Sequence, residues 1–121
     1  MRSMSISIAL VACSAGSDTP PPVDAPPPPP VVVLSSCPTA VDATVADSPT
    51  SFVPAMTNVT ARGVVKFMID AEHFVVPHLT QPTDQALMVS RGQTKCLRFD
   101  VAGSYSFVCG VHGFVGKIIV Q

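Results

Sequence analysis

A cysteine and a histidine three residues apart are the side chains of this sequence best suited to chemistry. They form the motif Cys109-Gly110-Val111-His112, which ends an alternating apolar run. A thiolate and an imidazole together select soft or borderline transition metals, copper foremost. Burial on an apolar strand face would raise the pKa of the thiol, and a bound metal would keep it deprotonated. The motif therefore favours a metal site, and the alternative is an inert buried cysteine beside a surface histidine.

Short β-strands must position this pair, because β-rich runs separated by turn residues dominate residues 38–121 and no helical stripe persists. We expect strong strands over residues 64–69, 94–100, 104–109 and 115–120, and weaker ones near 43–46, 56–60, 74–76 and 87–90. In the third strong strand, Tyr105, Phe107 and Cys109 share one face. Seven or eight short strands at this spacing predict an all-β, antiparallel Greek-key β-sandwich.

Composition limits the function. The chain has 121 residues, of which 12% are charged, and a formal net charge of -1. It has room for one domain, which we expect to be a monomer. No basic excess is present to bind a phosphate backbone, so a nucleic-acid partner is not expected. No base, nucleophile pair or substrate pocket is visible, so we do not expect an enzyme.

The N-terminal third is typical of an export signal followed by a spacer. Residues 1–12 carry one positive charge and a short apolar run, and Leu10-Val11-Ala12-Cys13 resembles the lipobox of bacterial lipoproteins. This resemblance implies lipidation at Cys13, removal of residues 1–12, and a membrane-anchored protein in the periplasm or at the cell surface. An ordinary signal peptide or a misassigned start codon is the alternative. Residues 13–36 contain a block of prolines and predict a polyproline II stalk or linker, which leaves residues 37–121 as the domain.

The remaining cysteines suggest one disulfide. An exported protein can keep such a bond. Cys96 points to the outer face of its predicted strand, and Cys37 lies where the linker ends and the domain begins. An incoming N-terminal segment could cross that strand, so we predict a Cys37–Cys96 bridge, with two free thiols as the alternative. The bridge would leave Cys109 as an unpaired thiol, which the metal site would explain.

The C-terminal stretch resembles the signature of the cupredoxins, the blue-copper proteins of the plastocyanin, amicyanin and pseudoazurin type. Residues 103–120 read GSYSFVCGVHGFVGKIIV, which follows the family pattern G-x-Y-x-F/Y-x-C-x-x-H, a short loop and a glycine-containing strand ending in valine. Upstream, residues 52–54 (FVP) and 59–67 (VTARGVVKF) support the likeness, and residues 70–75 (DAEHFV) stand where the family has its first histidine ligand. The resemblance spans roughly residues 45 to 121.

The resemblance implies a cupredoxin-like fold and one copper ion held by His73, Cys109 and His112. These residues would supply the trigonal set of two imidazoles and one thiolate that is typical of blue copper. His78 is the alternative first ligand, but it follows a proline and lacks the strand context, so His73 is favoured.

The sequence departs from the family at the axial position, because no methionine follows His112. Val115 would occupy that position as a non-ligand, with Val115 or Phe114 shielding this side of the copper. Loss of a thioether donor predicts an elevated reduction potential. The apolar rim around His112 would dock a redox partner protein through Val111, Gly113 and Phe114.

These features favour a one-electron carrier at the bacterial cell envelope. Two other classes remain open from the sequence. One is a copper storage or delivery protein, which would hand over the metal without redox cycling. The other is a metal-free structural domain on a stalk.

Overall fold

The computed structural model describes residues 29–78 and 84–121. The predicted signal segment, Cys13 and the linker up to residue 28 lie outside the described residues. Among the residues that are described, no helix has the length and apolar character needed to cross a bilayer.

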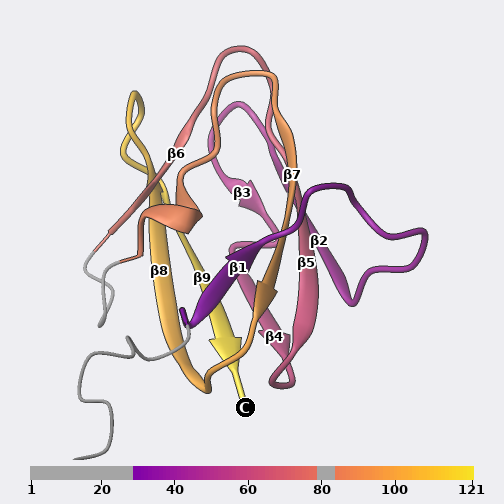
Figure 1. Cartoon of the computed structure of the whole chain (residues 1–121). Helices are drawn as coiled ribbons and strands as arrows, with labels where there is room; N and C mark the ends of the chain where they lie inside the picture. The colour runs from indigo at the N-terminus through magenta and orange to yellow at the C-terminus, as the bar shows by residue number, and fades with distance from the viewer. Residues whose placement is uncertain (1–28, 79–83) are drawn as a thin grey trace, which may run out of the picture.

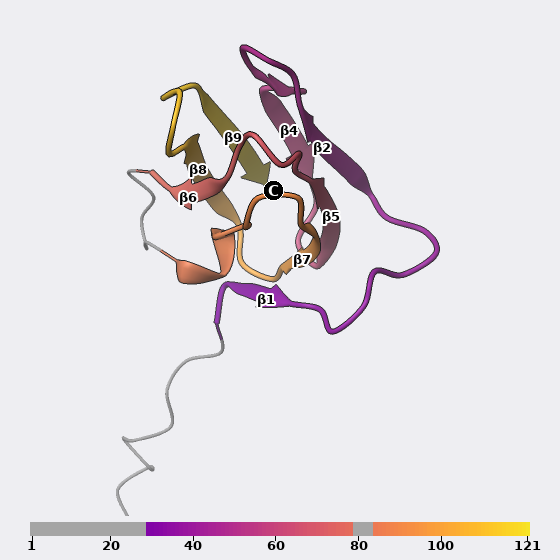
Figure 2. The same ribbon diagram turned by 90° about the horizontal axis from the view of Figure 1, so that it is seen from above.

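Two β-sheets pack face to face, which confirms the predicted all-β sandwich (Figure 1). The five-stranded sheet has the order β1 (Val31–Val33), β7 (Thr94–Phe99), β5 (Gly63–Met68), β2 (Ala43–Asp47) and β3 (Phe52–Val53). The four-stranded sheet has the order β4 (Met56–Val59), β9 (Val115–Val120), β8 (Gly103–Cys109) and β6 (Val75–Pro77). Most neighbours are antiparallel, but β2 pairs with β5 and β4 pairs with β9 in parallel. Seen from above, β6, β8 and β9 lie on one side of the molecule and β2 and β5 on the other (Figure 2).

The core forms where the alternating patterns of the two sheets meet. Tyr105, Phe107 and Cys109 of β8 are all buried, as their shared face predicts. Phe67 from the opposite sheet contacts Phe107 edge to face, with 5.3 Å between ring centroids, and Phe52 contacts the same ring at 4.8 Å. These aromatic contacts lock β8, which carries the cysteine of the candidate site, onto the five-stranded sheet.

The fold differs from the sequence expectation at its N-terminal boundary. We expected the linker to continue to residue 36, but Val31–Val33 form β1 and pair with β7, with Val31 opposite Phe99. Three successive β-branched residues favour an extended strand, and Val31 is only 2% exposed. The folded part therefore begins before residue 37, and the strands outnumber the seven or eight expected.

Two further segments differ from the expectation. The two-residue strand β3 was not expected, because so short a run carries no periodic signal. Residues 87–90 were expected to form a strand, but a 3₁₀ helix, η2 (Gln85–Leu87), occupies part of this segment. The Oδ1 atom of Asp84 accepts a hydrogen bond from the Ala86 N–H at 2.9 Å, which caps the helix and favours the turn over a strand. Within residues 87–90, the one strand-like pairing is an isolated antiparallel β-bridge between Val89 and Val75.

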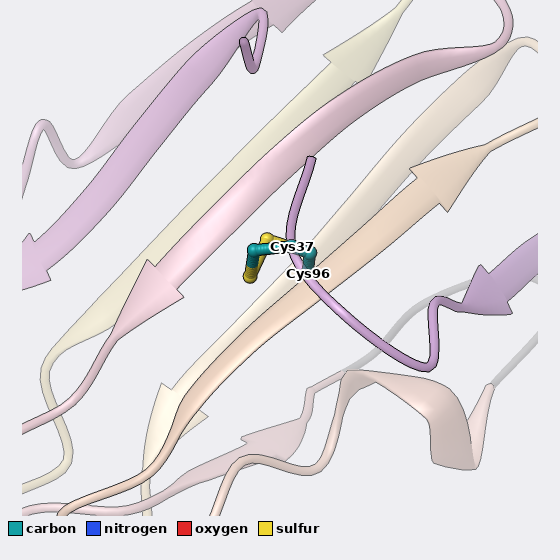
Figure 3. Close-up of a disulfide and its surroundings, with 2 residues drawn as sticks. All are labelled: Cys37 and Cys96. Atoms are coloured by element: carbon teal, nitrogen blue, oxygen red, sulfur yellow. A yellow bond between two sulfur atoms is a disulfide. The ribbon is translucent and has the colours of Figure 1, made fainter. Parts of the chain in front are cut away.

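Cys37 and Cys96 form a disulfide between the segment after β1 and strand β7 (Figure 3). Their Cα atoms are 5.3 Å apart and their sequence separation is 59 residues. Cys96 lies on the outer face of β7 yet is only 1% exposed, because the segment that carries Cys37 crosses over it. The bridge thus fastens the N-terminal segment to the sheet that it covers.

Candidate metal centre

The turn after β8 brings the cysteine and the histidine of the motif close together. The Gly113 N–H donates to the Cys109 carbonyl oxygen, and the Cys109 N–H donates to the Phe114 carbonyl oxygen, both at 2.9 Å. Gly113 has φ of 77°, a left-handed conformation that glycine adopts at little cost. These bonds close a tight loop that places His112 beside the end of the strand.

The loop between β5 and β6 supplies the second histidine. The His73 N–H donates to the Asp70 carbonyl oxygen at 3.3 Å, which turns the chain before β6. The Gly110 N–H then donates to the Phe74 carbonyl oxygen at 3.2 Å and joins the two loops. Gly110 has no room for a side chain, because a Cβ atom there would overlap the Phe74 ring. The absence of that atom allows the two ligand-bearing loops to touch.

His73, Cys109 and His112 converge, with one potential ligand atom from each lying within 4.8 Å of the others. The Cys109 Sγ and the His112 Nδ1 are 3.9 Å apart, and the two imidazole centroids are 4.9 Å apart. His73 is 2% exposed and Cys109 is 1% exposed, whereas His112 lies at the surface. The three residues therefore form a buried site that has one ligand reaching solvent.

The donor atoms fit a transition metal. The Nδ1 atom of His73 contacts the Oδ2 atom of Asp47. Its Nε2 atom is buried and has no hydrogen-bond partner among the described residues. A buried polar atom normally has a partner, so a metal ion is a reasonable explanation for this nitrogen. Two imidazoles and a thiol are the donors that copper and related metals select.

The surroundings of Cys109 favour its thiolate form. Burial raises the pKa of Cys109, but hydrogen bonds from the backbone of His112 and Val111, from the His112 side chain and from the backbone of Phe74 lower it to about 7. Such hydrogen bonds stabilise a negative sulfur atom. The metal-free protein therefore already favours the negatively charged thiolate that a metal cation would bind.

The pKa of His73 is raised, chiefly by its hydrogen bond to Asp47, with burial acting in the opposite direction. A carboxylate beside an imidazole favours the protonated ring. Metal uptake at this residue therefore competes with protons at acid pH.

The structure places the alternative ligand elsewhere. His78 follows β6, where its N–H donates to the Ser106 carbonyl oxygen at 2.9 Å, and it does not belong to the group formed by His73, Cys109 and His112.

The apolar residues around the site differ in how they contact the two histidines. Val115, at the start of β9, is 46% exposed. Phe114 packs on both imidazoles, with centroids 5.2 Å from that of His73 and 6.1 Å from that of His112. Val111 is 50% exposed, and Gly113 also lies at the surface.

Sequence reasoning missed Asp47. It lies at the end of β2, in a different sheet from the cysteine, and 26 residues before the histidine that it contacts. The one available signal was a carboxylate ending an apolar strand, which by itself indicates only a solvated turn.

No protein-family model matches this sequence, and no curated protein matches it. Solved structures of amicyanin do match. The amicyanin from Paracoccus versutus is 18% identical, with a TM-score of 0.60 over 76% of this chain and 98% of that one. A reduced Cu(I) form of an amicyanin mutant is also 18% identical, with a TM-score of 0.60 over 77% of this chain and all of that one. A reduced-state amicyanin mutant is 20% identical, with a TM-score of 0.59 over the same shares of the two chains. The chain therefore has the fold of amicyanin, a cupredoxin-like β-sandwich.

Proposed function

We propose that this protein is a type-1, or blue, copper protein that carries one electron at a time. The observation that carries the proposal is the convergence of two imidazoles and one thiol, in which the Nε2 atom of His73 is buried without a partner. Amicyanin, which shares the fold, has been solved in reduced and oxidized states and with Cu(I) bound, which supports the same metal here.

His73, Cys109 and His112 would hold the ion. Copper bound there would supply a one-electron couple between Cu(II) and Cu(I). The chain contributes a fixed arrangement of donors, because Cys109 ends a paired strand and its loop is closed by the bonds to Gly113 and Phe114. Such a frame can keep the ligand positions nearly unchanged between two oxidation states, and a small rearrangement makes electron transfer fast.

His112 is the route by which an electron would leave the site. It is the exposed ligand, and neighbouring loop residues form an apolar rim beside it, among them Val111, which is 50% exposed. The rim also contains Gly113 and the half-buried Phe114. A small apolar surface fits a redox partner protein that binds weakly and leaves quickly.

We infer that the axial side of the site lacks a thioether. No methionine follows the motif, and the Phe114 ring lies beside both histidine rings, edge to face with His73 and parallel to His112. We propose a copper site with three strong ligands and no methionine, and consequently an elevated reduction potential.

We also propose that the domain is tethered at the bacterial cell envelope through Cys13. The Cys37–Cys96 disulfide supports an oxidising compartment. The tether would enter at the end of the sandwich opposite the metal centre. Pro30 accepts a hydrogen bond from the Asp100 N–H at 2.8 Å, just before β8 begins, whereas Cys109 ends that strand (Figure 1). A site facing away from the membrane would be open to partners.

Voltammetry of the copper-loaded protein tests the function. An electron carrier gives a reversible one-electron wave that survives many cycles. A storage or delivery protein gives no reversible wave but passes its copper to a chelator. Absence of a reversible wave in a protein that retains copper would contradict the proposed function.

A further inference from the structure

One face of the four-stranded sheet points away from the core and carries a single lysine and no acidic side chain. In β4, β8 and β9, alternate residues are buried and the residues between them face outward. Lys117 is the one lysine or arginine at the outward positions of this sheet, and none of these positions holds aspartate or glutamate. β8 and β9 lie along one side of the molecule, with β2 and β5 on the other (Figure 2). Within the part of the chain that the structure describes, the Lys117 amine forms no ion pair.

An apolar row crosses this face beside the candidate metal centre. Val76 of β6 lies opposite Val108 of β8, and Val108 lies opposite Val115 of β9. Val108 and Val115 come directly before and after the loop of residues 109–114, which carries two of the candidate ligands. Val115 is 46% exposed, and the other two valines are half-buried. We call these three residues the valine row, and they place apolar surface on the sheet next to the ligand loop.

A row of hydrogen-bond donors lies next to the valine row. The His78 N–H donates to the Ser106 carbonyl oxygen at 2.9 Å, which continues the pairing of β6 with β8, so His78 faces outward as Val76 does. Ser106 in turn lies opposite Lys117 of β9. Side chains directly opposite each other on one face have Cβ atoms about 5 Å apart, so an imidazole, a hydroxyl and an ammonium group follow one another across three strands. This donor row offers a cation and two further donors with no acidic side chain of its own, which fits a carboxylate supplied by another molecule.

We propose that this face docks the redox partner through an apolar surface that carries an exposed aspartate or glutamate. The partner's carboxylate would lie on the donor row, against Lys117, and its apolar side chains would cover the valine row. Complementary charges speed association and orient the complex, and a small apolar area permits rapid release. A second copy of this face would bring another lysine and no acidic side chain, so the charges favour a different protein as the occupant. The inference rests on the proposed function for the redox role of the partner, whereas the surface exists without copper.

NMR of the isotope-labelled, metal-free full chain tests the surface with a defined probe. The probe is a short peptide in which leucine alternates with glutamate, and the control peptide carries lysine in place of glutamate. We expect the glutamate peptide to shift the backbone amide signals of Ser106, Val108 and Lys117. The lysine peptide should leave these signals unchanged, because it would repel Lys117 and offers no carboxylate to the donor row.

Variants separate the contribution of the charge from that of the apolar contact. Lys117→Glu should weaken binding of the glutamate peptide about tenfold, because it replaces an attraction by a repulsion. Val108→Ser should weaken it several-fold by removing apolar surface from the valine row. The matched control is Lys66→Glu, which changes another half-buried, outward-facing lysine, on β5 of the five-stranded sheet, and it should leave the affinity unchanged. Thermal unfolding of each variant checks that the fold is intact.

A kinetic measurement tests the redox role of the same face. A reduced acidic [2Fe–2S] ferredoxin serves as the probe and passes one electron to the Cu(II) protein, which becomes the Cu(I) protein. At low ionic strength, Lys117→Glu should lower the second-order rate constant several-fold, whereas Lys66→Glu should not. Equal rate constants for these two variants would overturn the assignment of this face to electron transfer.

The NMR titration decides whether the face binds an acidic partner at all. Glutamate-peptide shifts confined to other faces, equal shifts from the lysine peptide, or equal affinities of Lys117→Glu and Lys66→Glu would each overturn the inference. If the metal-free protein bound the glutamate peptide as expected but took up no copper, the proposed function would fail and the docking face would stand.

Discussion

Cys109 is the residue on which the candidate site depends. The thiol ends a buried strand face in the core, where an uncharged cysteine would be the stable form. The surrounding hydrogen bonds reverse this preference and lower its pKa to about 7. A low pKa combined with two nearby imidazoles separates this cysteine from an inert core residue.

The metal-free protein should therefore show a thiolate near neutral pH. We expect the ultraviolet absorbance of the Cys109 thiolate to appear with a pH midpoint of about 7. This midpoint lies below the pKa of about 8.5 for a cysteine in an unfolded chain. Because the folded pKa is the lower one, the ionised thiol stabilises the fold above the unfolded pKa. That contribution is lost as the pH falls through about 7. The variant Cys109→Ser should lack the transition, and a wild-type midpoint above the unfolded value would contradict this description.

The missing axial donor gives a second prediction for a single residue. If Val115 occupies the axial position, as proposed, Val115→Met would place a flexible thioether beside the copper. We expect the reduction potential to fall, because a thioether donor stabilises Cu(II). Voltammetry of the two proteins measures the change, and an unchanged or higher potential would count against the assignment of Val115 to this position.

At the scale of the strands, close approach requires glycine where β9 crosses the core. Gly116 is buried opposite Phe107 in the β8–β9 pair. A Cβ atom there would overlap the Phe107 ring and lie 3.1 Å from Phe52. The Phe107 and Phe52 rings therefore leave room only for glycine at this position of β9.

Gly116→Ala should destabilise the protein by about 1–3 kcal/mol, the usual cost of overpacking a core. Urea unfolding measures the change. Ser104→Ala, on the exposed end of the adjacent strand, should cost less than about 0.5 kcal/mol. Equal stability of the two variants would show that the Phe107 ring yields easily.

The strands that could be predicted from the sequence are those with regular alternation. β5, β7, β8 and β9 show this pattern and formed close to the expected bounds. β1 could not be predicted, because its three valines follow the prolines without alternating and its burial depends on pairing with β7. The contact between Asp47 and His73 could not be predicted either, because it depends on the parallel pairing of β2 with β5. Local patterns report faces and turns, whereas contacts between distant strands require the topology.

At the scale of the whole molecule, the disulfide ties the N-terminal segment to the sandwich. It closes a loop across a sequence separation of 59 residues and joins the segment after β1 to the outer face of β7 (Figure 3), and neither of its cysteines belongs to the candidate metal groups. Its role is therefore stability rather than metal chemistry.

Replacing both Cys37 and Cys96 by alanine should lower the free energy of unfolding by about 2–4 kcal/mol, because the unfolded chain regains its freedom. Urea unfolding measures the loss, and the wild type under reducing conditions is the comparison. The folded double variant should bind copper as the wild type does. Loss of copper binding in that folded variant would show that the bridge also shapes the site.

The addition of Cu(II) to the purified protein is the most direct test of the whole proposal. We predict an intense visible absorption band from charge transfer between the Cys109 thiolate and copper, at one ion per chain. Cys109→Ser should abolish the band, and Cys37→Ser should leave it intact. A wild-type protein that remains colourless with Cu(II), or a band that persists in Cys109→Ser, would contradict the account.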